Sequence, residues 1–367
     1  MPLIAFLVAS VYYPGIFGPA YMPKWWAMAL GLPLVPNISV TNMRPAVATA
    51  WIAGLAWAFA LLFISHHPVN GALPFAFMLL LFAVAVAASG LDDIKPTMLA
   101  LILGLLPSSL LVIPQTLDWW SPVPQSVAPA GLFINREILA EFAAPLLVWA
   151  LISRRWWWAV IPALPVALCY SRVAVFVVAC SLLYAWAARW YWKALCIAAV
   201  AVLCVAAFFF LGIGKEWSAG LRMVLWGAAV MSITPLGHGL GWWAAAHPFP
   251  SEEFVHSDAL QVLVELGLPG ALLLAVPVLC WRRRAHVSIR AAFVAVCIEA
   301  AVSFPLHAPA QGFLWALLAG FLGSRVAVRG SAGYSRRAGD GDHFLWPAAV
   351  RGGVLDRSQS RRRAIPF

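Results

Sequence analysis

Charged residues are scarce in this sequence, and their scarcity excludes a soluble globular domain. They make up 10% of the 367 residues, while hydrophobic residues make up 63%. An ordinary soluble domain is about 25% charged and about 45–50% apolar. Apolar runs of about twenty residues, the length needed to cross about 30 Å of hydrocarbon, recur from end to end. We therefore expect an all-α, polytopic membrane protein.

Motifs of metal and nucleotide chemistry are also missing. The six cysteines lie in apolar segments without C-x-x-C spacing, so the sequence suggests neither a disulfide framework nor a zinc site. There is no H-E-x-x-H motif, and no expected outer loop has a paired acidic motif to hold a divalent metal on a diphosphate. We expect no metal and no cofactor. No internal repeat is visible.

What the chain does contain is a series of about twelve apolar segments. We expect membrane spans at roughly 3–18, 24–36, 46–65, 71–89, 96–114, 137–152, 156–170, 173–188, 194–213, 259–281, 289–305 and 308–324. With both termini in the cytoplasm, 19 of the 24 lysines and arginines face inward, as the positive-inside tendency requires. Lys24 is one of the five that face outward. Because this placement accounts for most of the net charge of +10, nucleic acid is not expected as a partner.

The chain divides into a membrane domain, residues 1–324, and a basic tail, residues 325–367. The first apolar run has no basic stretch before it and no cleavage site, so we expect a retained span. The tail holds nine arginines and is expected to be disordered beside anionic lipid headgroups. An outer loop at 214–258, between the ninth and tenth spans, is the densest polar stretch before the tail. Chemistry on a soluble substrate or a lipid headgroup is expected there.

A polar stripe runs into the membrane after His256. Asp258, Gln261 and Glu265 lie at i, i+3 and i+7 and share one face of an otherwise apolar helix. A capping box formed by Asp258 and Gln261 would explain two of them. The capping box does not explain Glu265. A carboxylate inside the membrane is costly and is usually functional or paired. We interpret the stripe as a working site, and capping with packing is the alternative.

Arg222 lies in Ser218–Ile233, which is expected to form an amphipathic helix on the outer surface. Its guanidinium can grip a phosphate through two parallel hydrogen bonds, as an anionic lipid-linked substrate would require. The alternative is an arginine that snorkels to lipid headgroups. Gly237, Gly239 and Gly241 permit a tight turn close to a ligand, but their spacing is not that of a phosphate-binding loop.

Arg172 follows Ser171 near the outer end of the seventh span or the start of the eighth, where a charge so close to hydrocarbon favours an anionic partner. That partner is either a substrate or one of Glu137 and Glu141. The two glutamates lie four residues apart on the sixth span and repel each other unless a cation lies between them. A favourable acidic residue at a helix N-terminus is the plainer explanation for Glu137.

Three histidines, His238, His247 and His256, recur at intervals of nine in the outer loop. Equal spacing has no special meaning for metal binding. A single histidine with a pKa near the operating pH is the commoner device for moving a proton. His307, at the outer end of the eleventh span, can join it.

Four segments within residues 130–322 resemble the O-antigen ligase family of envelope proteins. They are Gly131-Leu132-Phe133-Ile134-Asn135, Ser171-Arg172, the pattern Arg222-x3-Trp226 with Pro235-x-Gly237-x-Gly239, and the pattern His256-Ser257-Asp258-x2-Gln261-x3-Glu265-x-Gly267-x2-Gly270. The last resembles the most specific signature of the family. Glu137 stands where the family often has asparagine, and Val173 where it has glycine.

The resemblance implies a GT-C-like fold with a large periplasmic loop, in the bacterial inner membrane. It also implies transfer of a glycan from an undecaprenyl-diphosphate carrier to an acceptor hydroxyl of lipid A-core or another glycan, without metal or nucleotide. In this interpretation the catalytic residues are His256, which orients or deprotonates the acceptor, and Arg172 and Arg222, which hold the diphosphate. Substrate-binding or orienting roles fall to Asn135, Ser171, Asp258, Gln261, Glu265 and His307.

Other functions stay open at this point. A polysaccharide polymerase or a protein O-oligosaccharyltransferase would use the same donor apparatus and differ only in its acceptor. A transporter of lipid-linked sugars would also have many spans and a basic cavity, although it would place its substrate groups near the membrane midplane. A scaffold would not require Arg172, Glu265 and His256 together.

Overall fold

The computed structural model describes residues 1–13, 21–36, 38–65, 68–121, 128–133, 135–187, 216–246, 255–279, 285–303 and 305–325. Within these ranges the chain is helical with irregular connections, and an isolated antiparallel bridge joins Met43 to Ser324. The expected all-α class is thus confirmed for this part of the chain. The expected span at 194–213 and the tail from residue 326 onward lie outside the described residues.

The helices follow the apolar segments of the sequence. In chain order they are α1 (Pro2–Ser10), α2 (Met22–Gly31), α3 (Pro45–Ile64), α4 (Pro68–Ser89), α5 (Lys95–Thr116), α6 (Arg136–Ile152), α7 (Trp156–Leu168), α8 (Arg172–Trp186), α10 (Glu216–Met231), α11 (Trp242–Ala246), α12 (Asp258–Leu279), α13 (Val287–Val302) and α14 (Pro309–Leu322), with 3₁₀ turns η1 (Leu32–Leu34), η2 (Val40–Asn42) and η3 (Pro305–His307). Proline stands in the first turn of α1, α2, α3, α5 and α14. There its fixed φ favours the helix, and its missing N–H is one that the helix would not use.

Four of the described helices are long and apolar enough to cross a membrane. They are α3, α4, α5 and the stretch Asp258–Pro277 of α12. Shorter apolar helices include α7, α8 and α14. α1 is shorter than the span expected at 3–18, and its nine residues rise only about 14 Å. The structure therefore supports a helical membrane protein.

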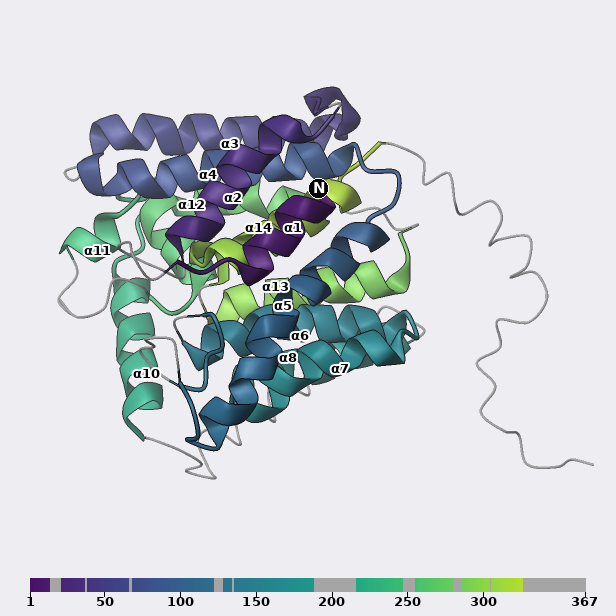
Figure 1. Ribbon diagram of the computed structural model, residues 1–367. Helices are drawn as coiled ribbons and strands as arrows, with labels where there is room; N and C mark the ends of the chain where they lie inside the picture. The colour runs from purple at the N-terminus through teal and green to yellow at the C-terminus, as the bar shows by residue number, and fades with distance from the viewer. Residues whose placement is uncertain are drawn as a thin grey trace, which may run out of the picture. The chain divides into compact units, whose positions relative to one another are not determined.

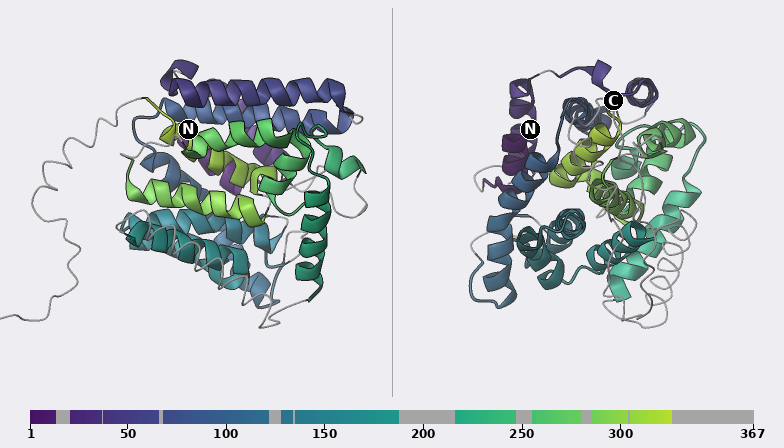
Figure 2. Two further views of the ribbon diagram at one scale, coloured as in Figure 1. Left: turned by 180° about the vertical axis from the view of Figure 1, so that it is seen from behind. Right: turned by 90° about the vertical axis from the view of Figure 1, so that its right-hand side faces the viewer.

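The core of the described part is built on α6 and α14. Every residue of α14 is buried, and so is the continuous stretch 138–150 of α6. α14 packs against α4 and α13, α6 against α7, α8 and α13, and α12 against α3. Most of the long helices run side by side, while α10 lies crosswise to them at one end (Figures 1 and 2).

α12 agrees with the span expected at 259–281, but it is not one continuous helix. Gly267 has φ 66° and ψ −169° and divides the segment into two helices. Four hydrogen bonds take up the freed backbone groups. They run from His238 N–H to Val264 O (3.0 Å), Gly239 N–H to Glu265 O (2.8 Å), Leu268 N–H to Pro235 O (3.0 Å) and the Trp57 indole N–H to Leu266 O (2.8 Å). Within hydrocarbon, the backbone N–H and C=O groups at a break in a helix need other hydrogen-bond partners.

The glycine turn at 235–241 fits against this break. Gly237 has φ 82°, and a Cβ on it would come within 2.5 Å of the Gly267 nitrogen. Its N–H faces Thr234 at 3.1 Å from Oγ1, and the next two N–H groups are bonded to α12. Gly237 thus approaches α12 closely, while Gly239 approaches Ser65 after α3 and Gly241 approaches Asn70 of α4. The N–H groups of residues 237–239 are bonded within the chain and do not form a phosphate cradle.

Candidate functional site

Polar residues from several helices meet where α6, α12 and α14 begin and α13 ends, and we call this region the site end. The Asp258 N–H donates to Ser303 O at 2.9 Å, which joins the start of α12 to the end of α13. Gln311 Nε2 donates to Ile138 O at 3.0 Å, which joins α14 to the start of α6. α10 crosses this end (Figure 1). Most of the residues singled out in the sequence lie here.

The shortest contact at the site end joins Asp258 and His307. Asp258 Oδ1 lies 2.6 Å from His307 Nδ1, and Asp258 Oδ2 accepts the Leu306 N–H at 2.7 Å. The Asp258 side chain is 1% exposed and that of His307 is 24% exposed. A buried carboxylate thus holds the ring in one orientation while part of the ring faces outward. This is how proteins orient an imidazole for proton transfer.

His307 lies in η3, between α13 and α14. Burial lowers the pKa of its imidazole, but the charge and hydrogen bond of Asp258 and the charge of Glu265 raise it further, so the net pKa lies above the usual value of 6.5. More of His307 is therefore protonated at neutral pH than of an ordinary exposed histidine. The protonated ring adds positive charge at the site end.

Ser257 caps α12, and Asp258 does not. Ser257 Oγ accepts the Leu260 N–H at 3.3 Å, as an N-cap side chain does. Gln261 Oε1 reaches back to the Val255 N–H at 3.3 Å. The capping box considered from the sequence thus leaves Asp258 unexplained, because its carboxylate is engaged by η3.

Glu265 lies on the same face of α12 as Gln261, as their spacing predicts. Gln261 Nε2 donates to Glu265 Oε1 at 3.3 Å. The same carboxylate accepts the Trp243 N–H at 3.3 Å and a backbone hydrogen bond from Gly241. Glu265 is 3% exposed. It therefore anchors the start of α11 to α12 and acts as a positioning residue for the loop beside the break.

Arg222 of α10 pairs with Glu137 in the first turn of α6. Arg222 Nη2 lies 2.9 Å from Glu137 Oε2, and their side chains are 18% and 42% exposed. Asn135 caps α6, because its Oδ1 accepts the Glu137 N–H at 2.8 Å. The cation beside the glutamates of α6 is thus Arg222. It is held near the surface, where an anionic ligand can reach it.

Two further glutamates, Glu141 of α6 and Glu299 of α13, are buried. Glu141 Oε2 accepts a hydrogen bond from Ser303 Oγ at 2.9 Å. Glu299 of α13 is fully buried, and neither of its carboxyl oxygens has a hydrogen-bond partner in the described part. Sequence reasoning considered Glu141 only as a partner of Arg172 and missed Glu299 and Ser303. A lone glutamate inside the apolar run at 289–305 was the available signal.

His256 precedes the cap of α12 and has φ 58°, in the left-handed region. It is half-buried, and its carbonyl accepts the Trp226 indole N–H of α10 at 3.3 Å. A non-glycine residue with positive φ is uncommon and persists where its surroundings hold it, often at functional sites. α10 therefore carries Arg222 and also contacts the His256 backbone.

Ser171 and Arg172 lie at the start of α8. Ser171 is buried and caps the helix, because its Oγ accepts the Ala174 N–H at 3.3 Å. Arg172 is exposed, and no ion pair joins it to an acidic side chain of the described ranges. The structure therefore gives Ser171 a capping contact and leaves Arg172 on the surface, and of the partners considered for Arg172 it pairs neither Glu137 nor Glu141 with it.

The remaining outer-loop histidines divide between the described and undescribed residues. The His238 ring stacks on Trp242, with 4.1 Å between ring centroids, and His238 Nε2 lies 2.9 Å from Ser232 O. These contacts fix the glycine turn to the end of α10. His247 lies outside the described residues, and so do Lys215, Glu252 and Glu253.

The chemistry available at the site end is that of cations and imidazoles beside buried carboxylates. In the part of the chain that the structure describes, no three His, Cys, Asp or Glu side chains are grouped so as to hold a metal ion. Neither a scan against models of known protein families nor a comparison with curated proteins found a match for this chain.

Proposed function

We propose that this chain is a glycosyltransferase of the O-antigen ligase type, which moves a glycan from undecaprenyl-diphosphate to an acceptor hydroxyl at the periplasmic face of the bacterial inner membrane. The observation that carries the proposal is the convergence of Arg222, His256 and the Asp258–His307 pair at one end of the apolar helices. A cation for a diphosphate and imidazoles for a proton thus lie in one region. This transfer needs both.

Donor binding would use Arg222. Its present partner, Glu137, is partly exposed, and such surface pairs contribute only about 0–1 kcal/mol. A diphosphate offers more charge and the geometry for two parallel hydrogen bonds with a guanidinium. Arg222 can therefore exchange Glu137 for the donor at little cost. Arg172, exposed at the start of α8, is the second arginine that we assign to the diphosphate.

The acceptor side would use His256. The acceptor oxygen attacks the anomeric carbon, the new glycosidic bond forms, and the bond to the diphosphate oxygen breaks with its electron pair leaving on the diphosphate. The hydroxyl proton passes to His256 and then to water. His307, held by Asp258, adds positive charge beside the developing negative charge of the leaving group. Direct displacement inverts the configuration at the anomeric carbon.

We assign lipid A-core as the acceptor by analogy with the O-antigen ligase family. Two related reactions would differ from this one only in their acceptor. A polysaccharide polymerase would use a second lipid-linked glycan, and a protein O-oligosaccharyltransferase would use a serine or threonine. A transporter of lipid-linked sugars is favoured by one feature, the break in α12, since transporters often bind substrate at broken helices. The backbone groups at this break are, however, bonded to residues 235–239 and Trp57.

Transfer by purified protein tests the proposal. The full chain in detergent is given undecaprenyl-diphosphate glycan and lipid A-core, with and without EDTA, beside His256→Ala, Arg222→Ala and, as a control from an expected inner loop, Arg284→Ala. We expect transfer that survives EDTA, is lost in the first two variants and is kept in the third. Near-normal transfer by His256→Ala would remove that residue from the mechanism. No transfer by folded wild-type protein to lipid, glycan or peptide acceptors would contradict the proposed function.

A further inference from the structure

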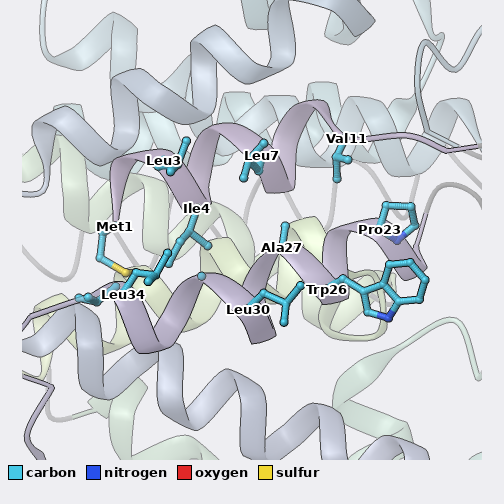
Figure 3. A pocket seen from close by; sticks show the side chains of 12 residues that line it. Met1, Leu3, Ile4, Leu7, Val11, Pro23, Trp26, Ala27, Leu30 and Leu34 are labelled. Atoms are coloured by element: carbon cyan, nitrogen blue, oxygen red, sulfur yellow. The ribbon is translucent and has the colours of Figure 1, made fainter.

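An apolar groove of about 420 Å³ runs between α1 and α2. Its lining residues are all apolar or glycine, and Leu7 and Leu30 lie along its length. Figure 3 shows side chains of both helices bordering this space, with Val11 and Pro23 at one end and Met1 and Leu34 at the other. No polar side chain of the described part interrupts the groove. Its walls suit a hydrocarbon chain.

A buried cation lies beside the Val11 end of the groove. The Lys24 ammonium donates to the Val11 carbonyl at 3.0 Å and lies 4.6 Å from the centre of the Phe133 ring. Lys24 is 1% exposed, and no acidic side chain of the described ranges forms a salt bridge with it. An ammonium has three donors and is strongly hydrated in water. One carbonyl and one aromatic face leave it short of hydrogen bonds and of counter-charge.

The Lys24 end of the groove is also next to the site end. Lys24, Phe133 and Ile138 border one small space together with the first residues of α14. Ile138 directly follows Glu137, the partner of Arg222. Lys24 and Arg222 therefore both lie near the first turn of α6.

We propose that the groove between α1 and α2 holds the part of the donor's polyprenyl chain nearest the phosphates, with the diphosphate bound between Lys24 and Arg222. This inference rests on the proposed function, because the donor is the ligand that such a transferase must hold. The occupant follows from charge complementarity: a wholly apolar groove with a cation at one end fits a lipid with one anionic end. A soluble anion would leave the groove unused, and a neutral lipid would leave Lys24 without a counter-charge.

The size of the groove agrees with this occupant. α1 has nine residues and α2 has ten, so each rises only about 14–15 Å. That is about half the hydrocarbon thickness of a bilayer. The groove therefore spans about one leaflet, and the remainder of a long polyprenyl chain stays among the lipids.

Photocrosslinking tests the groove without requiring transfer. Leu30 lines the groove and is 75% exposed, and Phe63 on α3 is 76% exposed outside it. Each is replaced by p-benzoylphenylalanine in the full chain, which is placed in phosphatidylcholine nanodiscs and irradiated with undecaprenyl phosphate. We expect an adduct by mass spectrometry at the Leu30 position that exceeds the Phe63 adduct by about tenfold or more. Equal adduct yields at the two positions would overturn the proposal. It would also be overturned if competing phosphatidylglycerol reduced the adduct at the Leu30 position as strongly as competing unlabelled undecaprenyl phosphate does.

Variants of Lys24 test the cation. Lys24→Met keeps much of the side-chain volume and removes the charge, so we expect the donor KM to rise about tenfold, the worth of one charge-assisted hydrogen bond. The acceptor KM should be unchanged, and Lys24→Arg should restore most of the donor affinity. A donor KM within twofold of wild type in a folded Lys24→Met protein would overturn the role of Lys24.

The two proposals fail in different ways. An enzyme that transfers glycan but gives no selective adduct at Leu30 keeps the proposed function and loses the groove. A protein that gives the adduct but transfers to no acceptor keeps a polyprenyl-phosphate site and loses the transferase function.

Discussion

The His307 ring is held by the carboxylate of Asp258, which is almost wholly buried. We therefore expect the protonation of His307 to change the stability of the folded chain. Because the pKa of His307 is raised in the folded chain, the stabilisation from its pairing with Asp258 is complete below about pH 6.5, the ordinary pKa of histidine. It is lost as the pH rises through the higher folded-state value. We expect the thermal midpoint of wild type to exceed that of Asp258→Asn at pH 6 and the difference to shrink by pH 9.

The control for this prediction is His307→Gln, which removes the titrating ring. In that background Asp258→Asn should change the thermal midpoint by an amount that does not depend on pH. A wild-type advantage that stays constant from pH 6 to pH 9 would show that the charge of His307 does not contribute, and that Asp258 acts through the Leu306 N–H alone.

The pairing of Arg222 with Glu137 should compete with donor binding. Glu137→Gln keeps the shape of the side chain and removes its charge, so Arg222 no longer has to leave a carboxylate to reach the diphosphate. Since a partly exposed pair contributes about 0–1 kcal/mol, we expect the donor KM to fall by up to about fivefold. Steady-state transfer kinetics measure this, and a donor KM that rises in Glu137→Gln would mean that Glu137 helps to bind the donor.

Local spacing predicted part of the site and could not predict the rest. The shared helix face of Gln261 and Glu265 follows from a period of 3.6 residues and is confirmed by their hydrogen bond. The Asp258–His307 pair joins residues 49 positions apart, and only the packing of η3 on α12 brings them together. Glu265 illustrates the same limit: its burial was expected, but its contacts with α11 depend on where that loop folds.

The elements show a similar division between local and distant causes. Expected spans at 46–65, 71–89 and 96–114 agree within a few residues with α3, α4 and α5, because long apolar runs define both ends. The break in α12 was not expected, although Gly267 and Pro269 lie in the sequence. What opens the helix is the distant turn at 235–239, which supplies the replacement hydrogen bonds.

Gly267 should therefore tolerate no side chain. Its φ of 66° disfavours an L-residue by about 1–2 kcal/mol, and a Cβ would lie 2.5 Å from the Gly237 nitrogen. We expect Gly267→Ala to lose about 2 kcal/mol or more of stability and to lose transfer, because the turn that fixes α11 and Glu265 is displaced. Thermal unfolding in detergent and the transfer assay measure the two effects.

The matched control is Gly227→Ala on α10. Gly227 is a helical glycine, and beyond its own helix backbone and chain neighbours no atom of the described residues lies within 4 Å of the place that a Cβ would take. Alanine should therefore raise stability by about 0.5–1 kcal/mol. If Gly267→Ala is as harmless as Gly227→Ala, the break is not needed for the fold of the site end.

Considered as a whole, the described part places its candidate chemistry at one end. α6 illustrates this directly: Asn135 caps its start, Arg136, Glu137 and Glu141 lie in its first half, and Arg154 and Arg155 follow its other end. From the positive-inside tendency we expect the end with Arg154 and Arg155 to be cytoplasmic. The proposed function requires the site end to be periplasmic, where it would have access to a donor displayed outside.

Cysteine labelling in spheroplasts tests this orientation. Asp118 and Arg154 make a matched pair, since both are exposed and both have φ 55°, beyond the ends of α5 and α6 respectively. With the native cysteines replaced by alanine, a maleimide that cannot cross the inner membrane should label Asp118→Cys in spheroplasts. It should label Arg154→Cys only after the membrane is opened. The reverse pattern would place the site end in the cytoplasm, where it could not use a glycan donor carried on the periplasmic leaflet.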